Sequence, residues 1–152
     1  SGDSRTIIKS EDGVIQLTKD AKPDDAEFGK RVRKRGGSVE FWPPFYRVTA
    51  PLSVVGLSCA SSIGDKGLIG PEGICCVPAR PKVTKYPLPR SGYLIIGCDG
   101  LFDVASTDDV GIKAMDYYEE REFSVRKMAE ALGCAAVNSK TEDNVSAIVV
   151  KL

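Results

Sequence analysis

The chain opens with two short apolar stretches that are separated by a polar segment. Residues 5–8 and 14–17 contain β-branched side chains at high density, and Ser10-Glu11-Asp12-Gly13 lies between them. Asp-Gly is typical of a tight hairpin turn, because glycine adopts positive φ without steric cost. The pattern therefore predicts a β-hairpin near the start of the chain.

A polar segment with a helical pattern follows the hairpin. Lys22-Pro23-Asp24-Asp25 is typical of a helix entry, since acidic residues are favoured in the first turn. The helix is expected to run to about Arg35 and to end at Gly36-Gly37. Residues 38–90 predict short strands and loops, in which 83–86 is strand-like.

The C-terminal third alternates between strand and helix patterns. Residues 93–98 form a continuous apolar run of strand length, which is typical of a strand covered on both faces. Ser106-Thr107-Asp108-Asp109 resembles a capping box, with Asp in place of Glu or Gln. We expect helices over about 106–119 and 124–137, and a closing strand over 145–152. The order of elements predicts an α+β fold.

The composition of the chain indicates the class of protein to which it belongs. The 152 residues fit one domain, and 42% apolar and 28% charged residues are ordinary for a soluble globular protein. Lys plus Arg equals Asp plus Glu at 21 each, so no uniform field draws in nucleic acid or an anionic membrane. The basic cluster at 30–35 is interpreted as a solvated helix face. No apolar run is long enough to span a membrane, so we expect neither nucleic acid nor membrane as a partner.

The residue types that are missing exclude several kinds of catalysis. The chain has no histidine, which excludes Ser-His-Asp and Cys-His catalysis within it and removes the usual zinc ligand. None of the five cysteines forms a C-x-x-C pair or is followed by arginine six positions later. An odd number of cysteines argues against a disulfide framework, so we expect an intracellular protein, cytoplasmic or nuclear.

Acidic residues at strand ends are the candidate functional residues. Asp99 follows the apolar run and precedes Gly100, and Asp103 comes four positions later. Asp143 precedes the closing strand, and Asp3 precedes the first strand. Hard divalent cations prefer such oxygen ligands. Taken alone, each aspartate is better explained as an ordinary turn residue.

Together, these positions stand in segments that resemble the metal-dependent protein phosphatase 2C family. The segments, in chain order, are Gly-Asp-Ser-Arg at 2–5, Leu-Thr-Lys-Asp-Ala-Lys-Pro at 17–23, Gly-Gly-Ser-Val at 36–39, Leu-Ser-Cys-Ala-Ser-Ser-Ile-Gly-Asp at 57–65, Pro-Lys-Val at 81–83, Leu-Ile-Ile-Gly-Cys-Asp-Gly-Leu-Phe-Asp-Val at 94–104, Glu-Asp-Asn-Val at 142–145 and Ile-Val-Val at 148–150. The resemblance covers essentially the whole chain, and its most specific part surrounds Asp99.

The resemblance implies a fold, an activity and a set of ligands. The fold would be an antiparallel β-sandwich flanked by helices in α-β-β-α layers, with 1–152 as the C-terminal part of the catalytic domain. The activity would be hydrolysis of phosphoserine and phosphothreonine in phosphoprotein substrates, by a water that Mn²⁺ or Mg²⁺ activates. Asp99 and Asp143 would be ligands of a metal pair, and Asp3 and Asp103 would contribute to a third, weaker metal site. No other residue of this chain would be catalytic.

The chain also departs from the family pattern. The phosphate-binding arginine, the Glu-Asp pair and the Asp-Gly-His segment of the family's N-terminal half are missing, Ala21 replaces a usual histidine and Ser61 a common arginine. We expect the missing N-terminal half to complete the fold as a partner, and the fragment alone to be inactive. A catalytically inactive pseudophosphatase that acts as a regulatory or binding module is the alternative. A plain scaffold whose acidic loops are only turns is the third interpretation.

Overall fold

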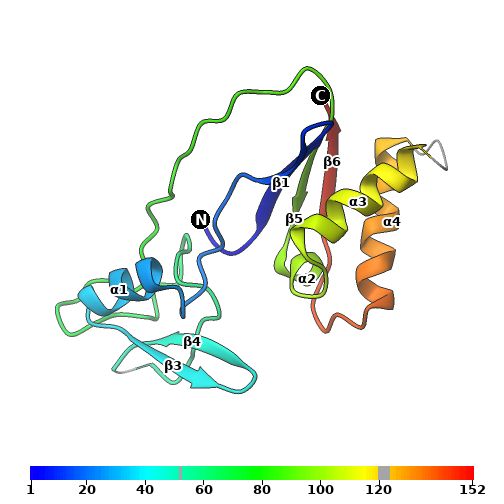
Figure 1. Ribbon diagram of the computed structural model, residues 1–152. Helices are drawn as coiled ribbons and strands as arrows, with labels where there is room; N and C mark the ends of the chain where they lie inside the picture. Colours follow the sequence, from blue (N-terminus) through cyan, green and yellow to red (C-terminus); the bar gives the residue numbers. More distant parts are fainter. Residues whose placement is uncertain (52, 120–123) are drawn as a thin grey trace. The chain divides into compact units, whose positions relative to one another are not determined.

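The computed structural model describes residues 1–51, 53–119 and 124–152. Two compact units make up this part of the chain (Figure 1). The first unit contains residues 1–3 and 20–83, and the second contains residues 4–19 and 84–152. Each unit has an antiparallel sheet and at least one helix, so the predicted α+β class is confirmed.

A four-stranded antiparallel sheet forms the centre of the second unit. Its strand order is β2-β1-β5-β6, with β1 at Arg5–Ser10, β2 at Gly13–Gln16, β5 at Tyr93–Gly97 and β6 at Ala147–Lys151. The predicted hairpin is confirmed, because β1 and β2 pair with Ser10 opposite Gly13. The expected apolar strand and closing strand are confirmed as β5 and β6, which pair with Gly97 opposite Ala147.

Three helices belong to the same unit, namely α2 at Asp99–Phe102, α3 at Thr107–Glu119 and α4 at Val125–Asn138. The core joins sheet to helices: Ile95 from β5 and Val149 from β6 are buried in one cluster with Met128 and Leu132 from α4. The helices predicted at 106–119 and 124–137 are thus confirmed, and they cover one face of the sheet (Figure 1).

The opposite face of this sheet is less well covered. Along β5, Leu94 and Ile96 are only partly buried, whereas their neighbours on the helix side are buried. On β6, Ile148 is 57% exposed and Val150 is 43% exposed. The expectation that the apolar run would be covered on both faces is therefore wrong for the described part of the chain.

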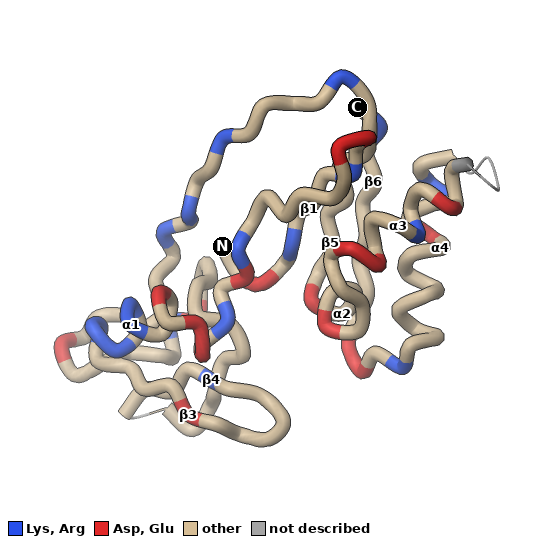
Figure 2. Tube along the Cα trace, in the orientation of Figure 1, with Lys and Arg blue, Asp and Glu red and all other residues tan. Residues whose placement is uncertain are grey.

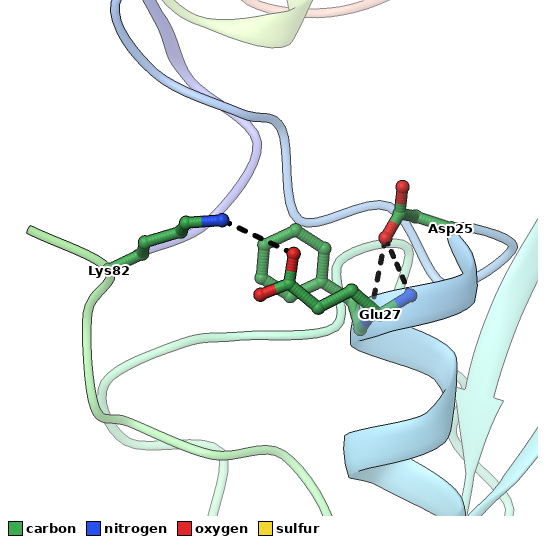
Figure 3. A network of polar contacts seen from close by, with 4 residues as sticks. Asp25, Glu27 and Lys82 are labelled. Atoms are coloured by element: carbon green, nitrogen blue, oxygen red, sulfur yellow. Dashed lines mark hydrogen bonds and ion pairs between the residues drawn. The ribbon is translucent and has the colours of Figure 1, made fainter. Parts of the chain in front are cut away.

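The first unit contains α1 at Ala26–Lys34 and a hairpin of β3 at Ser38–Trp42 and β4 at Phe45–Thr49. The helix predicted at its start is confirmed. The Asp25 carboxylate caps it by accepting from the backbone N–H of Glu27 at 2.9 Å, and Lys82 holds the Glu27 side chain at 3.2 Å (Figure 3). After the helix, Gly36 takes a positive φ of 81°, which glycine adopts at low cost.

One local prediction is confirmed and another is wrong. The β3–β4 hairpin, which turns at Pro43-Pro44, supplies short strands of the kind expected between residues 38 and 90. Residues 83–86, predicted to be strand-like, form no regular element, because no neighbouring strand pairs with them. Within the described residues, no helix is both long and apolar enough to cross a membrane.

Candidate metal centre

Asp99 stands where β5 ends and a helical turn begins. It is the first residue of α2, and its carboxylate accepts a hydrogen bond from the Gly100 backbone N–H at 3.0 Å. The backbone N–H of Asp103 donates to the Asp99 carbonyl at 2.7 Å. One short turn of helix therefore carries both aspartates, with Asp99 partly buried and Asp103 exposed at its end. The sequence allowed for a turn here, and α2 provides it.

Asp143 lies on the loop between α4 and β6 and is exposed. Its carboxylate accepts from the backbone N–H of Asn144 at 2.7 Å. Its own N–H donates to the Thr141 hydroxyl at 3.4 Å. These bonds shape the loop locally, and they use only part of the carboxylate's capacity to accept.

The loop of Asp143 packs directly against the turn of Asp99. A Cβ added at Gly100 would lie 2.2 Å from the Asn144 carbonyl oxygen and 3.5 Å from the Asp143 Cβ. Only glycine permits this approach, because real Cβ atoms do not come within 3 Å of a backbone oxygen. The structure thus places the segments of Asp99 and Asp143 side by side, and Figure 2 shows acidic positions on α2 and on the loop before β6.

Asp3 belongs to the other compact unit. Its carboxylate is 2.9 Å from the Lys22 ammonium group, and the Asp3 side chain is only 13% exposed. The adjacent backbone is held too, because the Ala21 N–H donates to the Gly2 carbonyl at 3.1 Å. No sequence pattern indicates the Lys22 contact, which joins residues 19 positions apart.

The donors fit a hard divalent cation in kind but are incomplete in number. Aspartate oxygens suit Mg²⁺ or Mn²⁺, whereas zinc sites rely on histidine and cysteine. Within the ranges that the structure describes, no three side chains of Asp, Glu, Cys or His lie close enough together to hold a metal ion. The described residues therefore do not form a complete cation site by themselves.

Cys59, whose thiol is affected by the charge of Asp3, is a poor nucleophile. Burial raises the pKa of the Cys59 thiol, the negative charges of Asp3 and Asp65 raise it further, and a backbone hydrogen bond from Ser61 and the charge of Lys22 oppose the shift. A raised pKa keeps the thiol protonated at neutral pH, and only the thiolate is nucleophilic. This agrees with the absence of a cysteine-phosphatase motif from the sequence.

The two substituted positions are both buried in the first unit. Ala21 is 2% exposed and Ser61 is 2% exposed. The Ser61 hydroxyl donates to the Pro78 carbonyl at 2.9 Å and shares a hydrogen bond with the Ser1 hydroxyl at 3.0 Å. Both side chains are thus integrated into the fold.

Comparison with known proteins gives a consistent result. The family model described as Protein phosphatase 2C matches residues 1–145. Probable protein phosphatase 2C 27 of Arabidopsis thaliana is 30% identical over 99% of this chain and 37% of its own length. Probable protein phosphatase 2C 61 of the same plant is 34% identical over 86% of this chain and 41% of its own length.

The solved structures agree on the fold. The crystal structure of a phosphatase from a pathogenic strain of Toxoplasma gondii matches with a TM-score of 0.80 and 25% identity, over 97% of this chain and 45% of that one. The fold class predicted from the sequence is therefore confirmed. The chain spans less than half the length of each of these relatives.

Proposed function

Because the chain belongs to the protein phosphatase 2C family, we propose that it supplies part of the active site of a Mn²⁺- or Mg²⁺-dependent serine/threonine protein phosphatase. The contact of Gly100 with the Asn144 carbonyl carries this proposal, because it brings the segments of Asp99 and Asp143 together. Aspartate ligands suit a reaction in which a metal-activated water, and not a protein side chain, is the nucleophile.

Bound cations would supply an activated water and would orient the phosphoryl oxygens of a phosphoserine or phosphothreonine substrate. The chain's own part is to hold and place the ligands. The α2 turn fixes the Asp99 backbone, and the hydrogen bond from the Asn144 N–H orients one oxygen of Asp143. Ligands on such supported elements keep the geometry that a binding site needs.

Asp3 and Asp103 are each proposed as a further cation ligand, on family likeness. Asp103 follows Asp99 by one turn of α2 and is exposed to solvent. Asp3 already forms an ion pair with Lys22, so a cation at Asp3 would compete with that ammonium group. The site at Asp3 would accordingly be the weaker one.

The remaining ligands would come from a further polypeptide segment, the N-terminal half of the family domain. Three observations support this partner: the described residues contain no complete ligand set, the chain spans less than half of its relatives, and the face of β6 carries exposed Ile148 and Val150. We further propose a cytoplasmic or nuclear location, because all five cysteines are free thiols.

The test is hydrolysis of a phosphothreonine peptide by the intact protein that contains this chain, with and without Mn²⁺. We expect chelation of the metal to abolish turnover and Asp99→Asn or Asp143→Asn to lower it by at least about 100-fold, the upper end of the range for disturbed metal sites. Asp116→Asn, at an exposed position of α3, is the matched control. Full activity in both site variants would refute the assigned roles.

A pseudophosphatase that binds partners without catalysis is the second candidate. The observation that favours it is the burial of Ala21 and Ser61 at positions where the family commonly has histidine and arginine. Calorimetry distinguishes the two functions. Micromolar binding of Mn²⁺ by the intact protein supports the phosphatase, and absence of binding supports the pseudophosphatase.

A further inference from the structure

The end of the β5–β6 pairing has an unusual bonding pattern. The two strands lie side by side, and α2 begins where β5 ends (Figure 1). Beyond the last pair of strand residues, the Cys98 N–H donates to the Ser146 carbonyl at 3.1 Å. In a regular antiparallel pair, the Ser146 N–H would return a bond to the Cys98 carbonyl.

That carbonyl is already used by the following helix. The backbone N–H groups of Leu101 and Phe102 donate to the Cys98 oxygen at 3.2 and 3.3 Å, and these bonds form the first turn of α2. The Ser146 N–H instead uses an acceptor other than the carbonyl that a regular strand pair would offer.

The side chain of Cys98 takes over this role. The Ser146 N–H donates to the Cys98 Sγ at 3.1 Å, and the thiol lies 3.1 Å from the Asn144 carbonyl, to which it donates. Cys98 thus makes three hydrogen bonds to the segment 144–146, two of them through sulfur. A thiol is a weak donor and a weak acceptor, but here it satisfies both backbone groups at one place.

These bonds connect the two candidate ligands. Cys98 immediately precedes Asp99, and Asn144 immediately follows Asp143. The first turn of α2 and a regular end of the strand pairing would both use the Cys98 carbonyl as hydrogen-bond acceptor. The helix takes the carbonyl, and the thiol accepts the hydrogen bond from the strand segment instead. Gly100 provides the space for close packing, and Cys98 provides the bonds that hold the loop in place.

We propose that Cys98 is a positioning residue for the metal centre, whose thiol holds the segment 144–146 against α2 so that Asp99 and Asp143 can share a cation. This rests on the proposed function of the two aspartates. Replacing a residue that orients a metal ligand without contacting the metal itself typically weakens metal binding or activity by 10–100-fold.

The experiment compares Cys98→Ala and Cys98→Ser in the intact protein, with Cys134→Ala on the exposed surface of α4 as the matched control. The first readout is the dissociation constant of Mn²⁺ by calorimetry. The expected result is about tenfold weaker binding in Cys98→Ala, binding within about threefold of the unsubstituted protein in Cys98→Ser, and no change in the control.

The second readout is amide hydrogen exchange in the metal-free protein. Loss of the sulfur acceptor should speed exchange of the Ser146 amide by at least about tenfold in Cys98→Ala and leave it near its original rate in Cys98→Ser. The hydroxyl of serine can donate and accept at the same place, so its rescue separates hydrogen bonding from simple packing.

Two results would overturn the proposal: unchanged Mn²⁺ affinity in Cys98→Ala, or a serine variant as weak as the alanine variant. If the unsubstituted protein binds no Mn²⁺, the proposed phosphatase function fails instead. In that case the exchange rate of Ser146 still decides whether the thiol holds the loop.

Discussion

Glycine at position 100 determines how closely two loops can approach. Its missing side chain leaves room for the Asn144 carbonyl oxygen, which would otherwise lie 2.2 Å from a Cβ. The obstacle is backbone, which cannot rotate away as a flexible side chain would. Any larger residue at this position must therefore move the loop that carries Asp143.

The first prediction concerns this position. We expect Gly100→Ala to lower the free energy of unfolding by about 1–3 kcal/mol, the usual cost of overpacking. Gly133→Ala is the control, since its Cβ would meet only Val145 at an ordinary 4.0 Å within helix α4. That variant should gain about 0.5–1 kcal/mol from helix propensity. Urea unfolding measures both, and equal stability of the two variants would contradict the account.

Residue identity also shows what the sequence could and could not predict about the site. Asp99 and Asp143 could be named as candidate ligands because their segments resemble those of the protein phosphatase 2C family. The contacts that support them could not be predicted, because they join distant positions: Lys22 to Asp3, and the Cys98 sulfur to Ser146. No pattern along the chain indicates which backbone carbonyl will accept the first hydrogen bonds of a helix.

Among the elements, α3 is the one whose N-terminal capping could be predicted in detail from the sequence. The expected capping box is confirmed: the Asp109 N–H donates to the Ser106 hydroxyl at 3.1 Å, and the Ser106 hydroxyl and N–H donate to the Asp109 carboxylate at 2.7 and 3.3 Å. These side-chain and backbone hydrogen bonds from Ser106 lower the pKa of the Asp109 carboxyl below 3.8. A lowered pKa means that ionised Asp109 stabilises the folded state above about pH 3.8, and that this contribution disappears as pH falls through the lower folded value.

The second prediction follows from the box. In Ser106→Ala the hydroxyl partner is lost, so the pKa of the Asp109 carboxyl should rise toward its ordinary value. Carboxyl carbon chemical shifts, followed by NMR during an acid titration, measure this directly. Ser124→Ala removes the cap of α4 and should leave Asp109 unchanged. A pKa of Asp109 that stays low in Ser106→Ala would show that the box is not its cause.

Other elements show why some predictions failed. Residues 83–86 have strand-like composition but no paired neighbour, and β propensity mainly reflects packing against adjacent strands. Residues 38–90 were predicted only as short strands and loops, without a named hairpin, because Pro43-Pro44 interrupts the apolar pattern between β3 and β4. The four residues of α2 are too few for a helical period to be visible.

At the scale of the whole molecule, the chain corresponds to less than half of a solved phosphatase. Its similarity to solved phosphatases extends over 97% of its residues, yet the described residues contain no group of three metal ligands. The partly uncovered face of the sheet, with Ile148 and Val150 exposed, points to the same incompleteness. We therefore expect the chain by itself to show no Mn²⁺-dependent turnover, and the addition of the rest of the domain to restore it.

The most direct test is NMR of the intact protein during a Mn²⁺ titration, because the paramagnetic ion broadens signals of nearby amides. The account predicts early broadening of the Gly100 and Asn144 amides. It predicts weaker and later broadening at Lys151, which lies at the far end of β6, and loss of the effect in the Asp99→Asn, Asp143→Asn double variant. Broadening that bypasses both amides, or that survives the double substitution, would contradict a metal centre at these two aspartates.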